Sequence, residues 1–213
     1  MKCDKKTMLL YAVTDRAWTG KQSLYEQVES ALKGGATCVQ LREKELGEEE
    51  FLQEAIAIAA LCKRYGVPFF VNDNVDIAVA CHADDIHVGQ EDMAAARVRE
   101  RVGEDMMIGV SAHTVEDALE AVKNGADCLG VGAVFSTGTK LDADDVSFDT
   151  LKAICEAVDI PVVAIGGIKK DNIRLLAGSG IDGVAVVSAI FAAEDIEAET
   201  RMLRETVREE LGV

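Results

Sequence analysis

Eight short apolar segments, rich in β-branched residues, constrain the fold of this 213-residue chain more than any other feature of its sequence. Each segment is nearly continuous in apolar residues, which is typical of strands buried on both faces of a parallel sheet. Stretches with helical periodicity separate most of them, among them residues 47–64, 114–123 and 192–211. The predicted strands are residues 9–13, 37–41, 68–71, 85–88, 107–110, 127–131, 161–165 and 182–187.

A repeated joint between helix and strand supports this alternation. The segments ALKGGATC from Ala31 and AVKNGADC from Ala121 share one pattern, and residues 177–183 carry a weaker third copy. In each copy a glycine can adopt the left-handed conformation that ends a helix, and an apolar strand follows. Such joints indicate stacked βα units. We therefore predict an α/β fold with residues 1–213 forming one (β/α)8 TIM barrel of near-minimal length, and an open doubly wound sheet is the alternative.

The charge balance excludes several classes of function. Thirty-eight acidic side chains against 22 Lys and Arg give a net charge of −16, opposite in sign to that expected of a nucleic-acid or anionic-membrane binder. No apolar run approaches the roughly 20 residues that cross a bilayer. The short apolar run near the N-terminus ends at Thr14 without a small-residue cleavage site, so no secretory signal is predicted.

The cysteines and histidines argue against a disulfide scaffold and a zinc site. The six cysteines form no Cys-x-x-Cys pair and stand mostly in apolar contexts, which predicts buried thiols in a reducing compartment, the cytoplasm. The three histidines form no zinc-binding motif. The sequence does not give the oligomeric state, and a homo-oligomer is compatible with it.

In a barrel of this kind, chemistry belongs at the carboxyl ends of the strands. After the second predicted strand, the two-residue period of a strand points Gln40, Arg42 and Lys44 in one direction. Two cations and an amide there suit a phosphorylated ligand. The alternative is a surface cluster of salt bridges with Glu43 and Glu45.

The next strand ends carry two acids and a hydroxyl. Asp73 and Asp92 follow the third and fourth strands and could share a Mg²⁺ ion, which favours one or two carboxylates together with substrate phosphates. The alternative for Asp73 is that this Asn-Asp segment caps a helix. Ser111, after the fifth strand, either donates to an anion or caps the helix that begins at Thr114.

The last three strand ends carry features of an anion site. Residues 135–142 combine hydroxyls, a glycine and Lys140, and could embrace an anionic group. Gly166 and Gly167 follow the seventh strand, where we expect a helix to open and the backbone to approach a phosphate. Together the strand ends predict two phosphorylated groups. Without a visible nucleophile pair, we expect the chemistry to depend on electrostatics and positioning.

Taken together, these segments resemble the thiamine-phosphate synthase family. The resemblance runs through most of the chain in the order of the family. The matching motifs are YAVTD from Tyr11, QLREK from Gln40, VND from Val71, HVGQED from His87, GVS from Gly109, TGTK from Thr137, AIGGI from Ala164 and VS from Val187. The family joins a hydroxymethylpyrimidine pyrophosphate to a thiazole phosphate, which gives thiamine phosphate and pyrophosphate.

The resemblance implies a set of site residues. Those implied to hold the pyrimidine pyrophosphate are Gln40, Arg42, Lys44, Asn72, Ser111 and Lys140; those implied to hold the thiazole phosphate are Thr137, Thr139, Gly167, Val187 and Ser188; and those implied to bind Mg²⁺ are Asp73 and Asp92. In the family the pyrophosphate leaves first, and the electron-rich aminopyrimidine stabilises the resulting methylene cation. Arg42, Ser111 and Lys140 would then be catalytic by stabilising the leaving group.

One departure from the family and three alternative functions remain. Ser136 stands where the family usually has proline, which frees the backbone of its loop. A related barrel, the thiazole tautomerase, would not need the complete pyrophosphate set. A non-catalytic phosphate or thiamine sensor would bind without turnover. A phosphosugar isomerase can share the fold, but no Glu/His acid–base pair is evident here.

Overall fold

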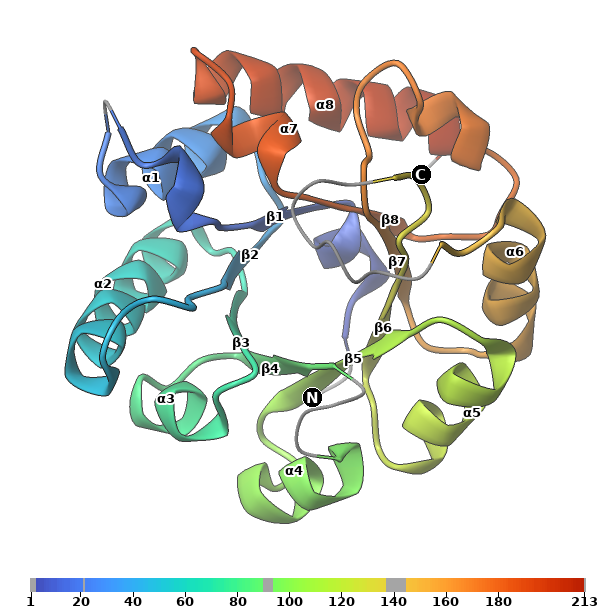
Figure 1. Ribbon diagram of the computed structural model, residues 1–213, viewed down its shortest axis with the longest axis horizontal. Helices are drawn as coiled ribbons and strands as arrows, with labels where there is room; N and C mark the ends of the chain where they lie inside the picture. The colour runs from blue at the N-terminus through green and yellow to red at the C-terminus, as the bar shows by residue number, and fades with distance from the viewer. Residues whose placement is uncertain (1–2, 21, 90–93, 137–144, 213) are drawn as a thin grey trace.

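Eight parallel strands close into a barrel in the computed structural model, which describes residues 3–20, 22–89, 94–136 and 145–212. Each strand pairs with the next along the chain, and β8 pairs with β1 through Leu10 opposite Val184. The ring of strands lies inside a ring of helices (Figure 1). The predicted (β/α)8 barrel is confirmed, and the open sheet is wrong because β1 and β8 leave no free edge.

The eight predicted strands are all present, with bounds shifted by at most two residues. They are β1 (Leu10–Val13), β2 (Cys38–Leu41), β3 (Phe69–Asn72), β4 (Asp85–Val88), β5 (Met107–Ala112), β6 (Cys128–Val131), β7 (Val162–Ile165) and β8 (Gly183–Val186). β-branched residues dominate these strands because their side chains pack well on a pleated surface that is covered on both faces.

The helices lie between and outside the strands. The α-helices are α1 (Leu24–Gly34), α2 (Glu48–Tyr65), α3 (Val75–Ala80), α4 (Ala95–Val102), α5 (Val115–Lys123), α6 (Phe148–Ala157), α7 (Ser188–Phe191) and α8 (Ile196–Leu211). The short 3-10 helices are η1 (Lys5–Met8), η2 (Arg16–Trp18) and η3 (Ile173–Leu176). In the described part of the chain, no helix combines the length and the apolar character that a membrane crossing requires.

Local capping explains where several helices begin and end. Ser23 with Glu26, and Thr114 with Asp117, form capping boxes at the starts of α1 and α5. The glycines of the repeated joint, Gly35, Gly125 and Gly180, all have φ between 90° and 99°. The structure therefore confirms the predicted left-handed conformation at each joint.

The predicted helix opening at residues 166–168 is wrong. Gly166 and Gly167 have φ of 101° and 61°, and two successive left-handed residues turn the chain away from a helical path. The segment forms a bend, and the 3-10 helix η3 begins only at Ile173.

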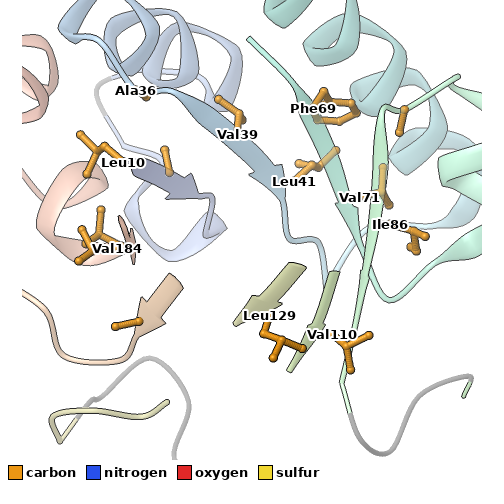
Figure 2. Packing of buried hydrophobic residues seen from close by; sticks show 14 of the residues in the cluster. Leu10, Ala36, Val39, Leu41, Phe69, Val71, Ile86, Val110, Leu129 and Val184 are labelled. Atoms are coloured by element: carbon orange, nitrogen blue, oxygen red, sulfur yellow. The ribbon is translucent and has the colours of Figure 1, made fainter. Parts of the chain in front are cut away.

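Two apolar clusters divide the core, as the alternation of a strand requires. Outward residues such as Leu41, Val71 and Ile86 pack beneath the helices (Figure 2). Inward residues such as Tyr11, Phe70 and Val163 fill the barrel interior. All six cysteines are free; four are buried and two are half-buried, so the prediction of buried thiols holds for most of them.

Closure of the barrel depends on the absence of a side chain at Gly183. A Cβ atom there would lie 2.0 Å from the carbonyl oxygen of Met8, a backbone atom that cannot rotate away. We expect Gly183→Ala to lower the free energy of unfolding by about 1–3 kcal/mol, as overpacked cores do. Urea unfolding measures the difference.

Gly20 provides the matched control, because a Cβ there would meet no atom within 4 Å. We expect Gly20→Ala to change the free energy of unfolding by no more than about 0.5 kcal/mol. Equal stability of the two variants would contradict the role assigned to Gly183.

Candidate active site

The polar residues predicted from the sequence gather where the strands end. Because all eight strands run parallel around a closed barrel, their carboxyl ends meet at one edge, here called the C-terminal rim. Nine predicted site residues lie in the described chain at or just after these ends: Gln40, Arg42, Lys44, Asn72, Asp73, Ser111, Gly167, Val187 and Ser188. The other four, Asp92, Thr137, Thr139 and Lys140, lie outside the described residues.

Arg42 is held at the rim by Thr14 and Asp15, the two residues that follow β1. Its Nη1 lies 2.9 Å from Oδ2 of Asp15, whose Oδ1 accepts from the backbone of Ala17. The backbone amide of Arg42 donates to Oγ1 of the fully buried Thr14 at 3.0 Å. Asp15 thus orients the guanidinium of Arg42. The guanidinium has further N–H donors that can bind an anion.

Glu43 fixes the segment that carries Arg42 and Lys44. Its carboxylate accepts from Arg16 at 2.5 and 2.8 Å and from the backbone amides of Glu45 and Leu46. Burial raises the pKa of Glu43, but these hydrogen bonds outweigh that effect, so its pKa is lowered. Arg16 also contacts Glu54 at 2.6 Å. The alternative surface cluster is therefore wrong, because Glu43 pairs with Arg16 and not with the two rim cations.

Asp73 and Lys44 form an ion pair across two neighbouring strand ends. Lys44 Nζ lies 2.5 Å from Oδ2 of Asp73, and the Asp73 side chain is 26% exposed. The capping alternative is wrong, because the side chain of Asn74 caps α3 by accepting from Ile77. Asp73 has a left-handed backbone, with φ of 63°, a strained conformation that is often found at functional sites.

Asp73 supplies the kind of ligand that Mg²⁺ takes. Its carboxylate already holds one cation, the ammonium of Lys44, and it is accessible from the rim. Among residues 3–20, 22–89, 94–136 and 145–212, no group of three or more His, Cys, Asp or Glu side chains is arranged so that it could hold a metal ion. Mg²⁺ requires only one or two carboxylates when waters and substrate phosphates complete its shell. Asp73 therefore fits the predicted metal site, and its predicted partner Asp92 lies outside the described residues.

Ser111 contacts a histidine inside the barrel. Nε2 of His87 lies 3.1 Å from Oγ of Ser111. The capping alternative for Ser111 is wrong, because Thr114 itself caps α5. Two glycines make room for the imidazole: a Cβ on Gly109 would lie 2.5 Å from His87 Nδ1, and one on Gly130 would lie 3.1 Å from Cε1.

The ends of β7 and β8 bring together the remaining predicted residues. These strands are paired neighbours, with Ile165 opposite Ala185, so Gly167 and Val187 follow adjacent strand ends. The side-chain amide of Asn172 donates to the carbonyl of Gly167 at 2.9 Å. A Cβ on Gly167 would lie 2.5 Å from the carbonyl oxygen of Ser136. Gly167 thus lets the loop after β6 pack closely, a role that the sequence analysis did not predict.

Several residues that organise the rim were missed in the sequence. Asp15, Arg16 and His87 act through partners 24 to 27 residues away, and nothing in their local pattern indicates those partners. Asp15 and His87 do stand inside the motifs YAVTD and HVGQED that carry the family resemblance. Their place inside these motifs was the sequence feature that could have identified Asp15 and His87 as site residues.

Comparisons with known proteins agree on one family. The family model described as thiamine monophosphate synthase matches residues 10–190. The thiamine-phosphate synthase of Clostridium acetobutylicum is 46% identical over 93% of this chain and 94% of its own length. That of Ruminiclostridium cellulolyticum is 50% identical over 92% of this chain and 93% of its own length. The solved thiamine phosphate pyrophosphorylase of Pyrococcus furiosus is 42% identical, covers 98% of this chain and 99% of its own, and has a TM-score of 0.90.

The hydrogen bonds of Glu43 lead us to predict how the free energy of unfolding depends on pH. Because the pKa of Glu43 is lowered in the folded protein, its stabilising contribution is complete above the ordinary pKa of a glutamate. That contribution is lost as the pH falls through the lowered value. We expect Glu43→Gln to reduce the free energy of unfolding by about 1–3 kcal/mol at neutral pH. The difference from wild type should shrink at acidic pH in urea unfolding.

Glu120→Gln is the matched control for Glu43→Gln, because Glu120 is exposed. We expect Glu120→Gln to change stability by no more than about 0.5 kcal/mol over the same pH range. A Glu43→Gln difference that stays constant down to the acid end would show that the Glu43 carboxylate is not the titrating group.

Proposed function

This chain belongs to the thiamine-phosphate synthase family, and we propose that its C-terminal rim is the active site for the family's transferase reaction. In that reaction a pyrimidine pyrophosphate and a thiazole phosphate give thiamine phosphate and pyrophosphate. The observation that carries the proposal is the pair of cations that follows β2, each held by an acid that follows a neighbouring strand, β1 or β3. Arg42 pairs with Asp15, and Lys44 pairs with Asp73.

A local cation pair solves the electrostatic problem of this acidic protein. At a net charge of −16, the molecule as a whole repels a pyrophosphate. Charge-assisted hydrogen bonds act over a few ångströms, where screening by salt is weak. Arg42 can meet a pyrophosphate through a planar fork of N–H donors. The Lys44 side chain is 54% exposed, so its ammonium can exchange Asp73 for a ligand oxygen.

We extend the proposal to the metal. Asp73, together with Asp92, would hold Mg²⁺, whose charge would neutralise the departing pyrophosphate oxygens. Asp73 supports this assignment because its half-buried carboxylate attracts a cation and is not used as a helix cap. The ion would also compensate locally for the acidic character of the chain.

The residues of the rim support a dissociative substitution. Arg42 and Lys44, with the predicted Lys140, hold the leaving pyrophosphate, and Ser111 can donate its hydroxyl to a pyrophosphate oxygen. His87 positions the Ser111 oxygen, because its Nε2 lies within hydrogen-bonding distance. The aminopyrimidine ring stabilises the methylene cation, and the thiazole nitrogen adds to it. This path needs no protein nucleophile, so the proposal assigns the Ser111 hydroxyl a role in binding the leaving group and not in attack.

The second substrate is assigned to the neighbouring strand ends. Gly167, Val187 and Ser188 would hold the thiazole phosphate, together with the predicted Thr137 and Thr139. The pairing of β7 with β8 supports this assignment because it brings the first three residues to one part of the rim. The tautomerase, sensor and isomerase alternatives are less favoured, since two of the relatives compared above are named thiamine-phosphate synthase and the third thiamine phosphate pyrophosphorylase.

A coupled turnover assay tests the proposal. The purified protein is mixed with both substrates and Mg²⁺, and thiamine phosphate and pyrophosphate are followed by chromatography. We expect both products in equal amounts, and we expect EDTA to abolish both. A folded protein that binds both ligands and forms neither product would overturn the synthase proposal.

Substitution of Asp73 tests the metal site. We expect Asp73→Asn to raise the Mg²⁺ concentration for half-maximal rate by about tenfold or more, in line with the effect of losing a charged ligand. Asp76, nearby on α3 and paired with Arg101, provides the control. Asp76→Asn should leave the Mg²⁺ dependence unchanged. Equal Mg²⁺ dependence of wild type and Asp73→Asn would remove Asp73 from the metal site.

A further inference from the structure

Three thiols gather at the N-terminal end of the barrel, on the side away from the C-terminal rim. Cys38 and Cys128 are the first residues of β2 and β6, and both belong to the cluster that fills the barrel interior. Cys3, which precedes η1, packs against the same cluster. Bulky branched residues usually fill the layers of such a barrel. Thiols at these positions bring a reactive group into the layer.

Two of these thiols contact each other. The side chains of Cys3 and Cys128 share a hydrogen bond, although they lie far apart in the sequence. Cys128 is 1% exposed, whereas Cys3 is half-buried. Because Cys3 belongs to no helix or strand, its sulfur can move toward Cys128 without disturbing the pairing of the strands. The pair thus joins an outer thiol that a small molecule can reach to an inner thiol enclosed by the barrel.

The hydrogen bond makes the two thiols unequal in reactivity. It lowers the pKa of Cys3, because a thiol that donates to the Cys3 sulfur favours the thiolate, and burial, Asp127 and Asp4 oppose this effect without cancelling it. The same bond, together with burial, raises the pKa of Cys128. The thiolate is the form that attacks an oxidant, so Cys3 reacts first. An accessible thiol of lowered pKa beside a second thiol is the arrangement of redox-sensing cysteines.

The surroundings of the pair favour oxidation over metal binding. In the described part of the chain, no group of three or more His, Cys, Asp or Glu side chains could hold a metal ion. The fully buried Asp85, at the start of β4, has a pKa that burial raises well above the ordinary value of an aspartate. Asp85 is therefore neutral at neutral pH and adds no charge that would oppose the Cys3 thiolate.

We propose that Cys3 and Cys128 form a reversible disulfide when the protein meets hydrogen peroxide, a modification that ties the N-terminal segment to β6. The Cys3 thiolate attacks one peroxide oxygen and the O–O bond breaks, which leaves a sulfenic acid on Cys3 and a hydroxide that takes up the proton lost by the thiol. The Cys128 sulfur then attacks the Cys3 sulfur, the S–O bond breaks, and a second water leaves with the Cys128 proton. Two thiols are thus oxidised to one disulfide, and one peroxide is reduced to two waters.

Peroxide treatment of the folded 213-residue chain tests the proposal. After a brief exposure, the remaining thiols are alkylated, the chain is digested without reduction, and the peptides are identified by mass spectrometry. We expect a linked peptide that contains Cys3 and Cys128 and that disappears with dithiothreitol. The absence of any linked peptide, or a link between Cys3 and Cys38, would overturn the proposal.

Thermal unfolding tests whether the disulfide ties the N-terminal segment down. The link would close a loop of more than half the chain and so restrict the unfolded state. We expect the oxidised protein to melt about 5 °C or more above the reduced protein, and dithiothreitol to reverse the shift. A linked protein that melts at or below the temperature of the reduced form would contradict this role.

Single substitutions separate the two steps. In Cys128→Ser, Cys3 should stop at the sulfenic acid, which dimedone traps as a stable adduct. Cys155→Ser is the matched control, because Cys155 is also half-buried but has a pKa that burial raises to about 11. It should form the linked peptide at the wild-type rate.

A comparison within the wild-type chain does not depend on the folding of any variant. We expect peroxide to oxidise Cys3 at least about tenfold faster than Cys155, because a larger fraction of Cys3 is thiolate. Equal rates of oxidation at Cys3 and Cys155 would show that Cys3 is not activated by Cys128 and would overturn the proposal.

Discussion

The backbone pairing of β8 with β1 is the constraint on which the rest of the structure depends. It removes the last free edge of the sheet and directs eight strand ends to one rim. That rim brings together two cations that follow β2, a carboxylate that follows β3 and a hydroxyl from β5. Closure also demands tight packing at its seam, where Gly183 meets the backbone of Met8. A side chain at position 183 would therefore hinder the pairing of β8 with β1 that closes the barrel.

The rim of this acidic protein is organised by matching each cation with an acid. Asp15 orients Arg42, Asp73 holds Lys44, and Glu43 is held by Arg16. These pairs keep the cations in place before any anion arrives, so little side-chain freedom is lost when one binds. The buried Glu43 network differs in kind from the two rim pairs. It has four hydrogen bonds and acts on the loop backbone, not on a ligand.

Strand positions were predictable because a strand that is buried on both faces has a continuous apolar sequence. The ends of several helices were predictable because a glycine in the left-handed conformation follows them. The location of the nine described candidate residues at the C-terminal rim was predictable from their place after the strands and from the family motifs, and their roles stay predictions. The contacts of Asp15, Arg16 and His87 were not, because each bridges 24 to 27 residues and depends on strand register. The helix expected at residues 166–168 failed because two glycines there adopt the same left-handed conformation in succession.

The space around His87 has an evolutionary consequence. The imidazole of His87, on β4, occupies the space that side chains at Gly109 on β5 and Gly130 on β6 would need. Three positions on three strands are therefore coupled by volume. A larger residue at Gly109 would overlap the imidazole, whereas one at Gly130 would press against it and require it to shift. A smaller residue at position 87 would leave a void against Ser111. In relatives of this chain, the three positions should behave as one unit of variation.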